Sequence, residues 1–150
     1  MAYSHSKSKI GVKMKIIILL MFLSANVQAI NIDRVELSFG GWSAHLFTDG
    51  KYNSTHNIKG LGVYSSGYYA ALSSFENSFY FNSYSLAVGK EYGNFLLGIN
   101  LATGYDKAGM SNIGKLSLAP ALTYQPKILG PIKISLISNA LLINFAVRIY

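Results

Sequence analysis

The stretch SYSLAVGKEYGNFLLGINLA, residues 83–102, decides the fold class, because large and small residues alternate on both sides of a short turn signal. Its first half sets Tyr84, Leu86 and Val88 against Ser85, Ala87 and Gly89. Successive side chains of a β-strand point to opposite faces, so this period of two predicts strands over 83–91 and 94–102. The sequence YGN between them predicts a tight connection.

The same alternation recurs along the chain, and no long segment has the 3.6-residue apolar period of a helix. Eight strands are predicted, over residues 34–46, 57–65, 68–75, 83–91, 94–102, 115–124, 131–138 and 141–150. We therefore predict an all-β protein, an eight-stranded antiparallel up-and-down β-barrel.

Small residues on one face of the strands indicate which side of this barrel meets lipid. They are Gly60, Gly62, Ala71, Ser73, Ser85, Ala87, Gly89, Gly98, Ser117 and Ala119. Such residues can fill a narrow lumen but cannot build a large apolar core. This favours the outer-membrane type of barrel, whose apolar face is outside. A soluble periplasmic barrel that binds a lipid remains an alternative, because the apolar positions of the last strand are out of phase with Tyr150.

The connections predict which strand ends lie together. Long and short links alternate over the first five strands, as in outer-membrane barrels with long outer loops and short periplasmic turns. With an even number of strands, the ends of the first, third, fifth and seventh strands share the outer rim. His45 and Ser78 are therefore expected at the same end of the barrel.

The N-terminal segment predicts export. Lys7, Lys9, Lys13 and Lys15 precede the apolar run IIILLMFL and the small residues of SANVQA. This pattern is typical of a secretory signal peptide over 1–29, with a possible true start at Met14, followed by a barrel domain over 30–150. The apolar run is shorter than a membrane-spanning helix requires. An exported, cysteine-free chain with many aromatic residues indicates a Gram-negative envelope.

Charge and composition argue against several classes of partner. The net charge of +7 falls to +3 without the leader's four lysines, and the remaining basic residues are scattered, so no nucleic-acid partner is expected. The chain has no cysteine and three separated histidines, which indicates neither a metal site nor a cofactor. We expect a monomer that has membrane lipid as its environment or substrate.

Ser78, His45 and Glu76 are the candidate catalytic residues. A nucleophilic serine needs a base and a group that orients the base. His45 lies at a strand end on the expected rim, whereas His56 falls in the first outer loop and is expected to be mobile. Glu76 lies two residues before Ser78 and would share its face if the strand continued. The alternative is that ENS is ordinary turn chemistry, because Asn and Ser bond their own backbone.

The order WSAH, YN seven residues after the histidine, YYAALSSFENSF and YSLAVGKEYG resembles the lipid A palmitoyltransferases of the PagP type, together with small exported bacterial and phage proteins. The similarity covers about Trp42 to Tyr92. It implies a palmitoyl transfer from phospholipid to lipid A, with His45 and Ser78 in the positions of that family's catalytic residues. The family has Asp before this serine, where the chain has Asn77. Either Glu76 substitutes, the enzyme works without this carboxylate, or the chain is a non-catalytic relative.

The resemblance also implies a mechanism. His45 would act as general base on Ser78, backbone N–H groups near Asn77 would stabilise the oxyanion, and the lumen beside Gly60, Gly62 and Gly89 would hold the acyl chain. The alternative function is a non-enzymatic surface barrel, encoded by a phage or its host, whose outer loops bind or mask an envelope component.

Overall fold

Nine strands and one short 3-10 helix lie within residues 31–47, 50–105 and 111–150, which the computed structural model describes. The strands are β1 (Arg34–His45), β2 (Lys59–Ser65), β3 (Tyr68–Glu76), β4 (Asn82–Tyr92), β5 (Phe95–Thr103), β6 (Ser111–Ile113), β7 (Leu116–Tyr124), β8 (Ile132–Ile137) and β9 (Ala140–Arg148), and the helix is η1 (Lys127–Leu129). The predicted leader falls on residues outside this range. Among the described residues, no helix is long and apolar enough to cross a membrane.

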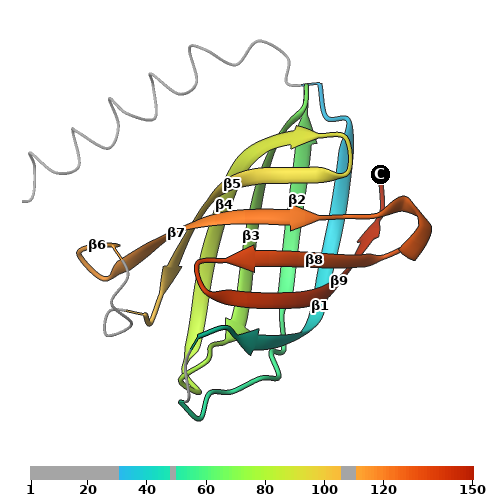
Figure 1. Ribbon diagram of the computed structural model, residues 1–150. Coiled ribbons are helices and arrows are strands. Elements are labelled where there is room, and N and C mark those ends of the chain that lie inside the picture. The colour runs from blue at the N-terminus through green and yellow to red at the C-terminus, as the bar shows by residue number, and fades with distance from the viewer. Residues whose placement is uncertain (1–30, 48–49, 106–110) are drawn as a thin grey trace, which may run out of the picture. The chain divides into compact units, whose positions relative to one another are not determined.

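Eight of these strands close into an antiparallel barrel (Figure 1). Each strand pairs with the next along the chain, β5 pairs with β7, and β9 pairs with β1 to complete the ring. The predicted all-β, eight-stranded, antiparallel barrel is confirmed, and each of its eight strands lies within two residues of the expected bounds at both ends.

The ninth strand, β6, was not predicted. Gly114, with φ of +65°, reverses the chain so that Ser111–Ile113 pairs with the first residues of β7. Three residues are too few for alternation to be recognised in sequence. β9 also ends earlier than expected, at Arg148, so Tyr150 lies beyond the strand.

The barrel has two distinct ends. We call the end formed by His45, residues 77–81 and the turn at 138–139 the loop rim. The opposite end, called the turn rim, contains the turns at 66–67 and 93–94 and residues 125–131. The turn at 66–67 is tight because both of its residues, Ser66 and Gly67, have positive φ, of 51° and 77°, as in the two-residue hairpin turns that match strand twist.

The outward face of the barrel is apolar. One row of leucines runs through cross-strand partners on six neighbouring strands: Leu37, Leu61, Leu72, Leu86, Leu101 and Leu118. The first four are exposed, and Leu72 is the most exposed at 62%. The alternation predicted from sequence therefore points its large apolar residues away from the lumen.

The inward face carries small and polar residues. Gly60, Ser73, Ser85, Ala102 and Ser117 form one row of cross-strand partners that faces the lumen. Among the described residues, the buried apolar cluster is correspondingly small and consists of Tyr64, Tyr69 and Leu96. Two hydrogen bonds join hydroxyl groups on this face: Ser73 with Ser85 at 2.7 Å, and Thr123 with Ser135 at 2.8 Å.

Candidate functional site

His45 and Ser78 meet at the loop rim, although 33 residues separate them in sequence. His45 is the last residue of β1, and Ser78 is the second residue after β3. The His45 Nε2 atom lies 2.8 Å from the Ser78 Oγ atom. The inference that both residues share one end of the barrel is confirmed, while their catalytic role stays a prediction.

Aromatic side chains hold this pair. The His45 ring stacks on Tyr52, with ring centroids 4.3 Å apart. Phe79 packs edge-on against Tyr52 and also against Tyr105, at 5.7 and 5.9 Å. Tyr52 therefore covers one face of the imidazole, and Phe79 supports Tyr52 from behind.

Asn77 builds the turn that presents Ser78. Its side chain is completely buried, and its amide nitrogen donates to the Ser83 hydroxyl at 2.9 Å and to the Gly104 carbonyl at 3.1 Å. Its amide oxygen accepts from the N–H groups of Phe79 and Phe81. All four hydrogen-bonding positions of the amide are therefore used. Asn77 has a structural role that a carboxylate, which cannot donate, would not fill.

An oxyanion site was expected among the backbone N–H groups near Asn77. This expectation is wrong for four of them, because each donates to an acceptor within the turn. The N–H of Asn77 donates to the Phe81 carbonyl, and that of Tyr80 donates to the Asn77 carbonyl. Those of Phe79 and Phe81 donate to the Asn77 side chain. These groups are committed to the turn itself, so they do not point to a substrate.

Tyr105 is a candidate that the sequence analysis missed. Its hydroxyl lies beside Ser78, whose side chain and backbone act to lower the pKa of Tyr105. Burial is the larger effect and raises the pKa of Tyr105, so the hydroxyl stays neutral at physiological pH. The available signal was its position two residues after β5, because the end of that strand shares the rim with Ser78.

Glu76 does not reach His45. Its carboxylate accepts from the Asn53 side chain at 2.9 Å, and its backbone carbonyl bonds the ring of His56. Asn53 also donates its backbone N–H to the Ser78 carbonyl at 2.9 Å. Glu76 therefore helps to join the first loop to the end of β3, and its predicted catalytic role has no support from these contacts.

His56 was expected to be mobile, and this expectation is wrong. Its ring is buried, with Nδ1 2.7 Å from the Glu76 carbonyl and Nε2 2.7 Å from Ser43 Oγ. A carbonyl can only accept, so Nδ1 carries the proton and Nε2 of the neutral ring accepts from Ser43. The loop lies close along β1: the N–H of His56 donates to the Gly41 carbonyl, and a Cβ on Gly41 would lie 2.7 Å from the end of the Ile58 side chain.

A cavity of about 580 Å³ extends from the His45–Ser78 pair into the barrel. Tyr52, Phe79 and Tyr105 line it at the loop rim, and Tyr64 and Tyr69 line it towards the turn rim. Its volume lies in the range of sites for small organic ligands. A Ser–His pair at the end of such a cavity can activate a hydroxyl against a bound ester.

Gly60, Gly62 and Gly89 were expected to leave room for an acyl chain in the lumen, but the space beside each of them differs. A Cβ on Gly62 would meet only ordinary contacts, the nearest at 3.6 Å, so a side chain can begin here without a clash. A Cβ on Gly89 would clash with the Leu97 carbonyl oxygen and would lie 2.7 Å from the Tyr69 ring. Gly89 thus serves close packing under Tyr69, and a Cβ on Gly60, 3.0 Å from Ser73, is also tight.

Comparison with known proteins does not identify a family. No protein-family model matches the chain, and no curated protein is significantly similar to it. The fold and the site define a closed eight-stranded antiparallel barrel with a Ser–His pair at one rim.

Proposed function

We propose that this protein is an outer-membrane β-barrel that transfers an acyl chain from a phospholipid to lipid A, with Ser78 as nucleophile and His45 as general base. The observation that carries the proposal is the 2.8 Å contact between His45 Nε2 and Ser78 Oγ beside a ligand-sized cavity. The two residues are 33 positions apart in sequence, so it is the fold of the barrel that brings them into contact.

The apolar outward face supports a membrane location. A water-soluble barrel would bury its large apolar residues inside, whereas here a continuous leucine row faces outward and the buried apolar cluster has three residues. Exposed apolar surface that extends round a barrel is the feature that lipid contact requires. The same feature argues against the soluble lipid-binding alternative.

Aromatic residues near the turn rim further support this location. Tyr68, Tyr92, Phe95 and Tyr124 are exposed there, next to the short turns. The Lys90 ammonium lies 5.4 Å from the ring centroids of both Tyr68 and Tyr92. Aromatic girdles with basic side chains reaching to the headgroups are typical of the membrane interface.

The chemistry proposed is an acyl transfer in two steps. Ser78 Oγ attacks the ester carbonyl of the phospholipid and its proton passes to His45 Nε2, and the proton then moves to the lysophospholipid oxygen as that C–O bond breaks. A hydroxyl of lipid A next attacks the Ser78 ester and gives its proton to His45. The bond from the acyl carbon to Ser78 Oγ breaks, Oγ takes the proton back from His45, and the free enzyme is restored. The Tyr105 hydroxyl, which lies beside Ser78, is the proposed donor to the oxyanion.

The test is made in a Gram-negative strain that lacks its own lipid A palmitoyltransferase. After fractionation has established that the protein is in the outer membrane, extracted lipid A is weighed by mass spectrometry. We expect one added acyl chain, and we expect it to be lost in His45→Ala. Unmodified lipid A from correctly located protein would overturn the proposed activity while leaving the membrane location in place.

A second candidate is a surface barrel that binds or masks an envelope component. It is favoured by exposed aromatic residues of the loop rim, Phe47 at 98% and Tyr80 and Phe81 at 64% each. Under this function, purified protein would bind lipopolysaccharide vesicles, Ser78→Ala would bind as well as wild type, and Tyr80→Ser would bind more weakly. Equal binding by Tyr80→Ser and wild type would count against it.

A further inference from the structure

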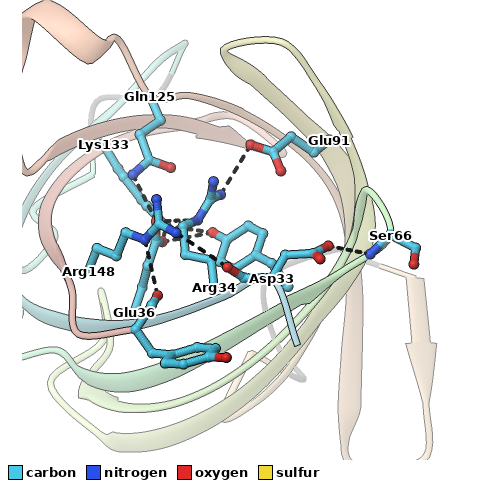
Figure 2. Close-up of polar contacts among 10 residues, drawn as sticks. Asp33, Arg34, Glu36, Ser66, Glu91, Gln125, Lys133 and Arg148 are labelled. Atoms are coloured by element: carbon cyan, nitrogen blue, oxygen red, sulfur yellow. Dashed lines mark hydrogen bonds and ion pairs between the residues drawn. The ribbon is translucent and has the colours of Figure 1, made fainter. Parts of the chain in front are cut away.

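A cluster of charged side chains closes the barrel interior near the turn rim. Figure 2 shows Arg34, Glu36, Lys133 and Gln125 gathered inside the ring of strands. The Lys133 ammonium lies 2.5 Å from Glu36 Oε2, and Glu36 is 2% exposed. These residues come from β1, β8 and the segment after β7, so the cluster joins β1 to β8 across the intervening strand β9.

This cluster separates two cavities. The 580 Å³ cavity below the His45–Ser78 pair is lined by Tyr64, Leu96 and Lys133 at its inner end. A second cavity, of about 590 Å³, lies at the turn rim and is lined by Arg34, Glu36 and Leu96. Leu96 borders both cavities, and Lys133 and Glu36, one on each side, are in direct contact.

We propose that the barrel is a pore for small inorganic ions and water, closed by the contact between Lys133 and Glu36. The inference rests on the proposed membrane location and is independent of acyl transfer. In the proposed open state the Lys133 side chain leaves Glu36, which removes the direct contact between the linings of the two cavities.

The other contacts of Glu36 make this opening feasible. A buried carboxylate that loses its only cation is strongly destabilised. Glu36 keeps the Arg34 Nε atom at 2.9 Å, and it accepts from the Tyr64 hydroxyl at 2.8 Å and from Gln125 at 3.1 Å. These groups would still compensate its charge after Lys133 had moved.

The displaced Lys133 also has polar neighbours. Lys133 already donates to the Tyr64 hydroxyl at 2.9 Å. Asn144 lies opposite Lys133 in the pairing of β8 with β9, and its side chain borders the same cavity. Arg34 is held between Glu36 and Glu91, the latter at 3.1 Å, so it stays in place as Lys133 moves.

The test is single-channel recording of the refolded full barrel in planar bilayers in potassium chloride. Wild type is expected to open rarely and briefly. Lys133→Ala, which removes the closing side chain, is expected to raise the single-channel conductance at least about threefold. Glu36→Gln keeps the size of the side chain but removes its charge, which weakens its attraction for the Lys133 ammonium. We therefore expect the open fraction to rise about tenfold, at unchanged conductance.

The matched control is Lys90→Ala, which removes the same side chain from the outward face and should behave as wild type. Heat-modifiable migration on gels verifies that each variant is folded before recording. Conductance of folded Lys133→Ala equal to that of Lys90→Ala, with no change in the open fraction of Glu36→Gln, would overturn the pore. Failure of wild type to enter bilayers at all would overturn the membrane location, and the pore with it, whereas lipid A acylation is scored separately.

Discussion

The side-chain amide of Asn77 donates a hydrogen bond to the backbone carbonyl of Gly104, across 27 positions of sequence. A Cβ on Gly104 would lie 2.8 Å from this nitrogen and 2.8 Å from Ser83 Oγ. The contact joins the loop after β3 to the end of β5, and thereby places Ser78 next to Tyr105. The residue beside the proposed nucleophile is therefore a support for the loop rather than a member of the reacting group.

Asn77→Asp is expected to destabilise the barrel instead of improving catalysis. A carboxylate would face the Gly104 carbonyl and could not donate to it, so we expect a loss of about 1–3 kcal/mol in the free energy of unfolding. Urea unfolding in detergent micelles measures this, with the exposed turn variant Asn94→Asp as control. Equal stability of the two variants would contradict the supporting role.

Ser78→Ala is expected to lower the rate of acyl transfer at least about a thousandfold, because the nucleophile is removed. The barrel contains a second Ser–His pair, Ser43 with His56, so Ser43→Ala is the informative comparison. Ser54→Ala, in the exposed part of the first loop, controls for expression. If Ser43→Ala abolished transfer and Ser78→Ala did not, the nucleophile would be Ser43.

Tyr105→Phe is expected to lower kcat about a hundredfold with little change in KM, because a donor to the oxyanion acts mainly in the transition state. The ring is retained, so its packing against Phe79 is preserved. Since burial raises the pKa of Tyr105, the hydroxyl should stay protonated through neutral pH, and the rate should show no decline from this group between pH 7 and about 9. A rise in KM with unchanged kcat would assign Tyr105 to substrate binding alone.

Leu72→Arg places a charge in the middle of the outward leucine row. In lipid vesicles this should cost about 2–4 kcal/mol of stability, the usual effect of a basic residue near the bilayer midplane. The measurement is the urea dependence of the heat-modifiable folded band. Asn94→Arg, in a short turn, is the control and should fold as wild type. A folded, vesicle-bound Leu72→Arg with wild-type stability would argue that this face does not meet lipid.

Gly62→Met is expected to shorten the acyl chain that is transferred, because a side chain at this position enters the cavity without a backbone clash. Mass spectrometry of lipid A reads the chain length directly. Gly89→Ala is expected to impair folding instead, since its Cβ would meet the backbone of β5. An unchanged chain length in folded Gly62→Met would place the acyl chain elsewhere.

The strands could be predicted because their signal is local. Alternation such as Tyr84 to Gly89 follows from the extended backbone alone, and the tight turns follow from residues such as Ser66 and Gly67. The first and third strands of an up-and-down barrel run in the same direction and end at the same rim. This alone placed His45 and Ser78 at one end of the barrel, without any knowledge of their side chains.

The contacts of the site could not be predicted in the same way. His56 and Glu76 lie in or beside loops whose course depends on the strands they fold against, and nothing in their neighbouring residues specifies Ser43 or Asn53 as partners. The role of Asn77 depends on the Gly104 carbonyl, which arrives from another strand. Tyr105 gains its importance from the same meeting of loops.

Sequence by itself determined that the chain forms a barrel of eight strands with an apolar and a small-residue face, because side-chain direction in a strand has a fixed period of two. Only the tertiary structure decided which polar atoms meet, because closure of the ring sets the distances across the lumen and between loops. Glu36 and Lys133, 97 positions apart, become an ion pair through that closure alone.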